Sequence, residues 1–162
     1  MPMVKGFTLI ELIVTLAISS IVLLSSGGFY GKFVERQKVT ADISKIISAI
    51  SSARGHAISQ RENIHLCGIQ AEQCSRQWKV LSVFNANKDL LYRDTLSANY
   101  SQVLWSAFQR KSQLEFKPNG FTNHQNGTLY LCHKHYPTLN RAIIISKSGR
   151  VRTSQSVDNQ CL

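Results

Sequence analysis

The sequence predicts an α+β chain in which a long N-terminal α-helix, with a membrane-spanning first half, packs on a small, mainly antiparallel β-sheet domain. Three observations predict this: an uncharged stretch of 20 residues near the N-terminus, a helical apolar period after it, and a two-residue apolar period beyond it. The 162 residues suffice for one domain and an appendage. Large multidomain enzymes are therefore excluded.

The uncharged stretch covers residues 12–31. A helix of this length is about 30 Å long and matches the hydrocarbon core of a bilayer. Gly27, Gly28 and Gly31 lie where this helix would leave the bilayer. Because glycine has a low helix propensity, we expect a kink or a melted turn there.

The apolar segment contains one acidic residue near its start. Glu11 lies at a depth where inserting a charge costs about 2.5–3.5 kcal/mol. Gly6 precedes the apolar run, whereas the small-residue cleavage site of a secretory signal peptide follows it. The segment KGFTLIEL, residues 5–12, instead resembles the class III signal of type IV prepilins and pseudopilins.

That resemblance implies how the N-terminus is processed and used. A prepilin peptidase would remove residues 1–6 by cutting after Gly6, and the new N-terminal residue, Phe7, would be methylated. Glu11 would neutralise the N-terminal amine of a neighbouring subunit during filament assembly, since two opposite buried charges cost less together than alone. An ordinary single-pass anchor that contains a glutamate is the alternative.

The helix is expected to continue beyond the membrane to about residue 60. One apolar stripe at spacings of three and four consists of Val39, Ile43, Ile46, Ile47, Ile50, Ala53, Ala57 and Ile58. The residues expected off this stripe are Lys38, Asp42, Lys45 and Ser52. We expect the stripe to pack on a sheet.

The second half of the chain is expected to form antiparallel strands. A hairpin is predicted from residues 78–84 and 90–93 around an asparagine turn, residues 85–88. Further strands are predicted at residues 114–117, 128–133 and 141–146.

The order of these segments resembles the GspH/FimT family of minor pilins and pseudopilins. The motifs that carry the resemblance are the strand from Trp78 with its asparagine turn, LEFKPNGF (114–121), GTLYLC (127–132) and AIIISKSGRVR (142–152). The resemblance implies a type IV pilin-like fold, with residues 7–31 as the transmembrane and assembly half of the helix and residues 32–162 as a soluble head. It also implies a single-pass protein of the bacterial inner membrane with a periplasmic head, later assembled into the cell-surface pilus.

Four cysteines lie beyond the apolar segment, at Cys67, Cys74, Cys132 and Cys161. In the oxidising periplasm they would form disulfides, and four cysteines allow three pairings. We favour Cys67 with Cys74, which closes a small loop, and Cys132 with Cys161, which fixes the C-terminal tail to a strand.

The sequence offers little support for a metal site or for catalysis. A zinc site that uses His65, His133 and His135 is the alternative to the disulfides, but the spacings do not match a compact ligand set. The sequence contains no GxSxG, HExxH or P-loop motif. We therefore expect no enzyme activity, metal or cofactor.

The charge is more informative. The chain has 19 Lys and Arg against 9 Asp and Glu, a formal net charge of +10, which favours anionic partners. Lys147, Gly149, Arg150 and Arg152 form a basic tail in which a glycine turn precedes two arginines spaced i and i+2. In an extended chain both arginines project to one side, where they and the N–H groups of the turn could hold phosphates. Lys134, Arg141, Arg110 and Lys111 could widen this surface.

The GRxR form of the tail resembles that of FimT-type minor pilins, for which the resemblance implies DNA binding in natural transformation. We therefore expect a minor type IV pilin that binds extracellular DNA through its phosphates, independently of sequence, for DNA uptake. Its other partners would be major and minor pilins, the prepilin peptidase and, before assembly, the inner membrane. The alternatives are a structural minor pilin that primes or caps the pilus, or a GspH-type minor pseudopilin of type II secretion, with the charged tail serving only solubility.

Overall fold

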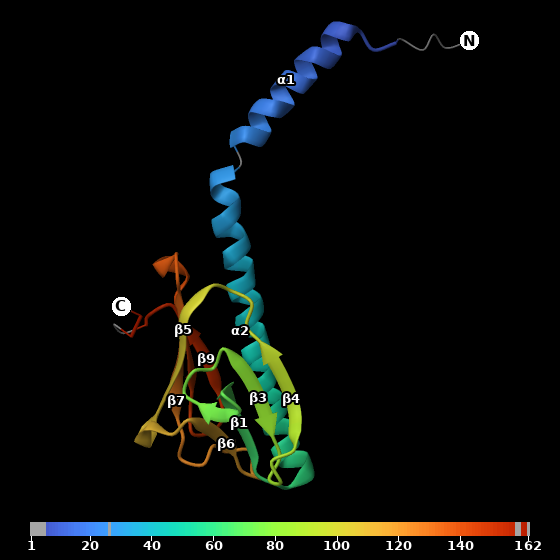
Figure 1. The fold of residues 1–162 in the computed structure, drawn as a ribbon. Helices are drawn as coiled ribbons and strands as arrows, with labels where there is room; N and C mark the ends of the chain where they lie inside the picture. The colour runs from blue at the N-terminus through green and yellow to red at the C-terminus, as the bar shows by residue number, and fades with distance from the viewer. Residues whose placement is uncertain (1–5, 26, 158–159, 162) are drawn as a thin grey trace, which may run out of the picture. The chain divides into compact units, whose positions relative to one another are not determined.

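The computed structural model of the chain describes residues 6–25, 27–157, 160 and 161 (Figure 1). The chain divides into two compact units, Met1–Glu35 and Arg36–Leu162. Most of the expected leader, residues 1–6, lies outside the described residues.

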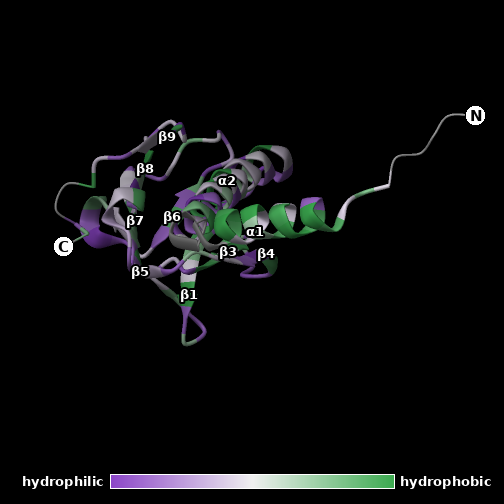
Figure 2. Ribbon diagram, turned by 90° about the horizontal axis from the view of Figure 1, so that it is seen from above, coloured by the Kyte–Doolittle hydropathy of each residue, from purple (hydrophilic) through white to green (hydrophobic). Residues whose placement is uncertain are grey.

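Helix α1, Leu9–Ser25, consists mostly of apolar residues, which are green in Figure 2. Helix α2, Gly27–Gln60, begins at Gly27 and Gly28, where a kink or melted turn was expected. Two helices, α1 and α2, therefore take the place of the single helix that was predicted. Gly31 lies inside α2 and does not interrupt it. In the described part of the chain, neither α1 nor any other helix has the length and apolarity needed to cross a membrane.

The C-terminal part of α2 supplies one side of the core. Val39, Ile46, Ile50, Ala53 and Ala57 are buried, as the apolar stripe predicts. The stripe ends earlier than expected, because the side chain of Ile58 is 49% exposed.

The expectation that Asp42 lies off the buried stripe is wrong, since this residue is fully buried. Its carboxylate accepts hydrogen bonds from the amide and hydroxyl of Ser97, at 2.9 Å each, and from the amide of Ala98 at 2.9 Å. A buried carboxylate is tolerated when donors compensate its lost hydration. Asp42 thereby fixes the loop that contains residues 97 and 98 to α2.

The first sheet, sheet A, is antiparallel in all its strand pairs and follows the order β2-β1-β3-β4, with β6 also paired to β1. Its strands are β1 Ile64–Gln70, β2 Gln73–Ser75, β3 Val80–Phe84, β4 Leu90–Thr95 and β6 Gln113–Phe116. The predicted hairpin is confirmed as β3 and β4, and its turn is closed by the Asp89 amide, which donates to the Asn85 side chain at 2.8 Å. Strands β1 and β2 were not predicted.

The second sheet, sheet B, is also antiparallel, in the order β5-β7-β8-β9. Its strands are β5 Tyr100–Ala107, β7 Gly127–His133, β8 Arg141–Ile145 and β9 Val151–Ser154. Figure 2 shows the order of these strands across the sheet. Two short 3-10 helices, η1 Phe108–Arg110 and η2 Pro137–Leu139, lie in its connections. The strands predicted at residues 128–133 and 141–146 are confirmed, whereas β5 and β9 were not predicted.

A tryptophan pair joins the two sheets. The rings of Trp78 and Trp105 are buried and stacked with centroids 4.8 Å apart. The Trp78 amide donates to the Val103 carbonyl at 2.8 Å, so residue 78 pairs with β5 and the predicted strand 78–84 begins only at Val80. One hydrophobic core therefore contains residues from α2 and from both sheets.

Two disulfides are present. Cys67 is bonded to Cys74, with Cα atoms 5.5 Å apart, and Cys132 is bonded to Cys161, with Cα atoms 5.2 Å apart. These are the pairs favoured from the sequence. The second bond attaches residue 161 to strand β7 of sheet B.

Candidate nucleic-acid interface

The basic tail forms the hairpin between β8 and β9, at the edge of sheet B. Its turn is closed by the Ser146 amide, which donates to the Arg150 carbonyl at 3.0 Å, and by the Gly149 amide, which donates to the Ser146 carbonyl at 2.9 Å. Gly149 has a φ of 76° in the left-handed region, where glycine alone is unstrained.

The inner side of this turn packs tightly on the head. A Cβ at Gly149 would lie 3.1 Å from the carbonyl oxygen of Gly120 and 3.2 Å from the Phe116 ring. On the other side of the turn, the Lys147 carbonyl accepts hydrogen bonds from the Thr122 amide at 2.9 Å and the Thr122 hydroxyl at 3.1 Å. The backbone of the hairpin is therefore fixed, while the Lys147 side chain is exposed.

The two arginines lie on the solvent side of the hairpin. Val151 packs against the core, whereas Arg150 before it and Arg152 after it are exposed. Because side chains alternate between the faces of a strand, both arginines lie on the outer face of sheet B.

The segment that carries these cations contains no negative charge. Residues 144–157 contain no acidic side chain, and Asp158 lies outside the described residues. Within the described part of the chain, no hydrogen bond or ion pair is found for the side chains of Lys147, Arg150 and Arg152. Their charges are therefore available to an anion.

A hollow of about 440 Å³ lies beside the hairpin on the outer face. Its lining includes Lys147 and Arg152 together with Asn126, Thr128 and Ser146. Its volume falls in the lower part of the range of small-molecule sites, about 300–1,000 Å³. The predicted residues Lys147 and Arg152 thus meet at one surface.

Two of the backbone donors of the turn, the Gly149 and Arg150 amides, are already used within the hairpin. The Gly149 amide is bonded to Ser146, and the Arg150 amide donates to the Ser146 hydroxyl at 3.1 Å. Gly149 is also buried, so its part in the site is to position the hairpin.

The other basic residues divide between the two ends of sheet B. Arg141 begins β8 at the end opposite the hairpin turn, and its guanidinium donates to the carbonyls of Thr138 and Asn140 at 3.0 and 2.7 Å. Lys134 follows β7 at that same far end. Arg110 and Lys111 follow β5 at the end where the turn lies, and both are exposed.

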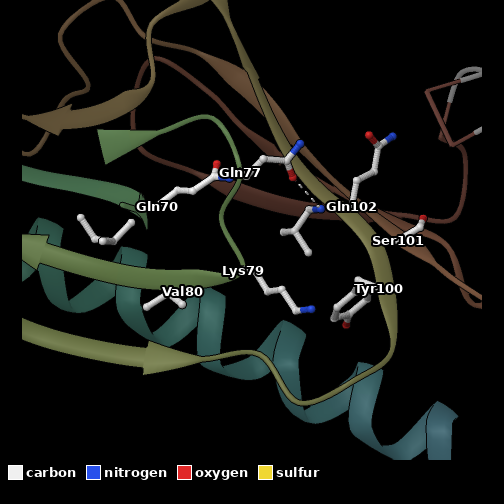
Figure 3. A pocket seen from close by; sticks show the side chains of 9 residues that line it. Gln70, Gln77, Lys79, Val80, Tyr100, Ser101 and Gln102 are labelled. Atoms are coloured by element: carbon white, nitrogen blue, oxygen red, sulfur yellow. Dashed lines mark hydrogen bonds between the residues drawn. The ribbon is translucent and has the colours of Figure 1, made fainter. Parts of the chain in front are cut away.

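A second hollow, of about 330 Å³, lies between β5 and the strands β1 and β3 (Figure 3). Gln70, Gln77, Lys79 and Gln102 line it, and the Gln77 side chain accepts a hydrogen bond from the Val103 amide at 3.3 Å. This contact belongs to the joint between the sheets.

The histidines considered for zinc have other surroundings. His133 is buried, and its Nδ1 atom accepts hydrogen bonds from the amides of His135 and Tyr136, at 3.2 and 3.1 Å. These hydrogen bonds stabilise the turn after β7. His65 lies in sheet A on β1. Among the described residues, no group of three or more His, Cys, Asp or Glu side chains could hold a metal ion.

One cluster of titratable groups has shifted pKa values. Burial tends to raise the pKa of the Asp94 carboxyl, but hydrogen bonds from the Thr95 amide, Lys45 and Tyr92 together hold this pKa below its ordinary value. Burial and the hydrogen bond to Asp94 raise the pKa of the Tyr92 hydroxyl. The Lys45 ammonium lies 3.3 Å from the carboxylate, so this cluster ties α2 to β4.

At the N-terminus, Phe7 is 77% exposed and Glu11 lies in the first turn of α1. The Glu11 carboxylate accepts a hydrogen bond from the Thr8 amide at 3.3 Å, and the Glu11 amide donates a hydrogen bond to the Thr8 hydroxyl at 3.3 Å. This reciprocal pair is a capping box. Within a single chain, the Glu11 carboxylate is therefore directed towards the start of the helix.

Comparisons with known proteins agree on the kind of molecule. The family described as type II transport protein GspH matches residues 42–149, and the prokaryotic N-terminal methylation motif matches residues 1–27. Two crystal structures of the type IV minor pilin FimU from Pseudomonas aeruginosa, strain PAO1, have the same fold. One is 22% identical with a TM-score of 0.63 and covers 80% of this chain and 99% of its own. The other is 19% identical with a TM-score of 0.58 and covers 76% of this chain and 99% of its own.

No curated protein matches the chain significantly in sequence. The GspH match nevertheless extends over more than half of the chain, and the α+β architecture is that of a type IV pilin. The chain therefore belongs to the GspH/FimT family of minor type IV pilins and pseudopilins.

Proposed function

We propose that this minor pilin binds extracellular DNA through Lys147, Arg150 and Arg152, and that it serves DNA uptake in natural transformation. The observation that carries the proposal is the pair of exposed arginines on one face of a fixed hairpin, without partners among the described residues. The family and fold are structural rather than enzymatic, so a binding role is the one to test.

The recognition would be electrostatic and independent of sequence. Guanidinium groups grip phosphate oxygens with two parallel hydrogen bonds, whereas the Lys147 ammonium acts as a point charge. Gly149 would contribute by holding the turn against Gly120 and Phe116. Three phosphate contacts imply affinity in the micromolar range, so useful capture would need several subunits.

The competing function is that of a pseudopilin, favoured by the family description as a type II transport protein. A titration of full-length protein, in neutral detergent, with labelled duplex DNA of random sequence separates the two, because secretion does not require DNA binding. For three phosphate contacts, the log of the affinity should fall against the log of the salt concentration with a slope of about −3.

The decisive variant is Arg150→Gln with Arg152→Gln. It should weaken binding equally on unrelated sequences and flatten the salt slope by about 2, because two phosphate contacts are lost. Lys79→Gln with Lys88→Gln is the matched control: both lysines are exposed, and two positive charges are likewise removed, away from the hairpin. Equal losses in both variants would show that the effect comes from net charge alone. Absence of wild-type binding at low salt would favour a structural minor pilin or a pseudopilin.

We further propose that residues 1–6 are a leader removed after Gly6, that Phe7 is then methylated, and that Glu11 pairs with the amine of a neighbouring subunit. The match of the N-terminal methylation motif supports this. It implies an inner-membrane precursor with residues 7–31 as the membrane and assembly segment and residues 32–162 as a periplasmic head. Replacement of Gly6 should leave the precursor uncut, which mass spectrometry of the membrane fraction measures. A mature wild-type protein that begins elsewhere than Phe7 would contradict the proposal.

A further inference from the structure

An exposed aromatic side chain lies at the same end of sheet B as the two arginines. Phe108, directly after β5, is 63% exposed. Ala107 before it is extended, with φ −112° and ψ 162°, and packs against the core. Because side chains alternate along an extended segment, Phe108 lies on the same outer face as Ser106.

The register of sheet B connects this face to the arginines. Ser106 pairs with Thr128, Thr128 with Ile144, and Ile144 with Arg152, so these residues form one row across the outer face. Residues paired directly across neighbouring strands point to the same face. Arg152 therefore faces the same side of the sheet as the residues of β5.

The next row contains the aromatic ring. The Phe108 amide donates to the Asn126 carbonyl at 3.3 Å, and the Ser146 amide donates to the Arg150 carbonyl at 3.0 Å, which continues the register by one pair beyond the strands. Phe108, Asn126, Ser146 and Arg150, the end row, thus cross the outer face. Phe108 and Arg150 are three strand spacings apart, about 14 Å.

A hollow lies beside the two central residues of this row, Asn126 and Ser146. It has a volume of about 440 Å³ and is lined by polar side chains, among them Asn126, Thr128 and Ser146, and by Ile144 and Ile145. Their amide and hydroxyl groups can donate and accept hydrogen bonds, as the edges of nucleobases require. Between Phe108 and Arg150, the middle of the row thus offers hydrogen-bonding groups beside a hollow that Lys147 and Arg152 also line.

The charge of this surface is of one sign. Residues 106–111, 126–128 and 144–152 contain no acidic side chain. Arg110 and Lys111 follow Phe108 directly and are exposed. Cations therefore occur at the aromatic end of the row as well as at the arginine end, which fits a polyanion that crosses the face.

We propose that the end row is a binding site for single-stranded DNA, in which one unpaired base stacks on Phe108 while the backbone runs to Arg150 and Arg152. This inference rests on the proposed DNA-binding function and specifies its substrate. A base inside a duplex is covered on both faces by its neighbours, so only an unpaired base can stack on the ring. The basic tail itself contains no aromatic residue, and the register supplies one from the residue directly after β5.

The test compares a labelled single strand with a duplex, using the full-length protein in neutral detergent and fluorescence anisotropy. Phe108→Ala should weaken binding of the single strand about tenfold to a hundredfold, the loss expected for one stacked base, and leave duplex binding within about twofold. Phe108→Trp should retain single-strand binding, and its added emission should be quenched by the single strand alone. Phe121→Ala, which removes a 45% exposed ring outside the end row, should change neither affinity.

The outcomes separate this inference from the function on which it rests. If Phe108→Ala leaves single-strand binding unchanged, or weakens both substrates equally, the stacking site is wrong. The DNA-binding function still stands in that case, provided that Arg150→Gln with Arg152→Gln weakens both substrates. If the wild type binds neither substrate at low salt, both proposals fail. Circular dichroism should show the Phe108 variants folded, because the ring is exposed.

Discussion

Gly149→Ala tests whether the backbone of the hairpin is held as the structure indicates. Alanine at a φ of 76° costs about 1–2 kcal/mol, and its methyl group would lie 3.1 Å from the Gly120 oxygen and 3.2 Å from the Phe116 ring. Because the first neighbour is backbone, the turn must shift. Together these effects should lower the free energy of unfolding by about 2–3 kcal/mol.

The same substitution at Gly55 should change the free energy of unfolding in the opposite direction. Gly55 lies in α2 and is exposed, and a Cβ there would meet no atom within 4 Å. Gly55→Ala should therefore stabilise the chain by up to about 1 kcal/mol through helix propensity.

Urea unfolding, followed by the fluorescence of buried Trp78 and Trp105, measures both variants. DNA affinity should also fall in Gly149→Ala, although no charge changes, because the turn that carries Lys147 and Arg150 is displaced. The reasoning is refuted if Gly149→Ala is as stable as Gly55→Ala.

Two other predictions concern the supports of α2. Asp42→Ala should lower the free energy of unfolding by about 2–4 kcal/mol, because the buried amide of Ala98 loses its acceptor; a loss below about 0.5 kcal/mol in urea unfolding would show that water replaces the carboxylate. Because the pKa of Asp94 is lowered in the folded state, its contribution is present above the unfolded pKa and is lost as the pH falls through the folded value. Lys45→Gln should therefore destabilise the chain at neutral pH by about 0.3–1 kcal/mol, a value discounted for solvent screening, and the difference from wild type should vanish once the pH has fallen below the lowered pKa of Asp94. A difference that persists in acid would indicate lost packing instead of lost charge pairing.

The sequence predicted the architecture where the patterns were regular. The stripe of α2 and the hairpin of β3 and β4 follow from periodicity, and the disulfides follow from compartment and spacing. Asp42 could not be assigned, because its burial depends on donors in residues 97 and 98, more than fifty positions away. Strand β5 was not predicted although most of its residues are apolar. Its Trp105 stacks on Trp78, which was assigned to the strand predicted at residues 78–84.

The site was predicted only in part, because charge does not show which cations are already used. Arg76, Arg93 and Arg141 look like Arg150 in the sequence. In the structure, Arg76 donates to the Trp105 carbonyl and Arg93 approaches the Ser82 hydroxyl at 3.4 Å, so both serve the fold. Phe108 was not recognised, because only the register of sheet B places it on the face of the arginines. The signal available in the sequence was an aromatic residue closely followed by two cations, Arg110 and Lys111.

The fixed backbone of the hairpin compensates in part for the weakness of the phosphate contacts that its side chains would make. Each long cation loses rotamer freedom when it grips a phosphate, so three such contacts leave little net affinity. Holding the backbone at Gly149 and Thr122 before binding removes the further cost of ordering a loop. A stacked base on Phe108 would add a contact that salt does not screen. The salt-dependent share of the binding free energy should therefore be smaller for a single strand than for duplex DNA. Phe108→Ala should reduce this difference to the part that the lower charge density of a single strand causes.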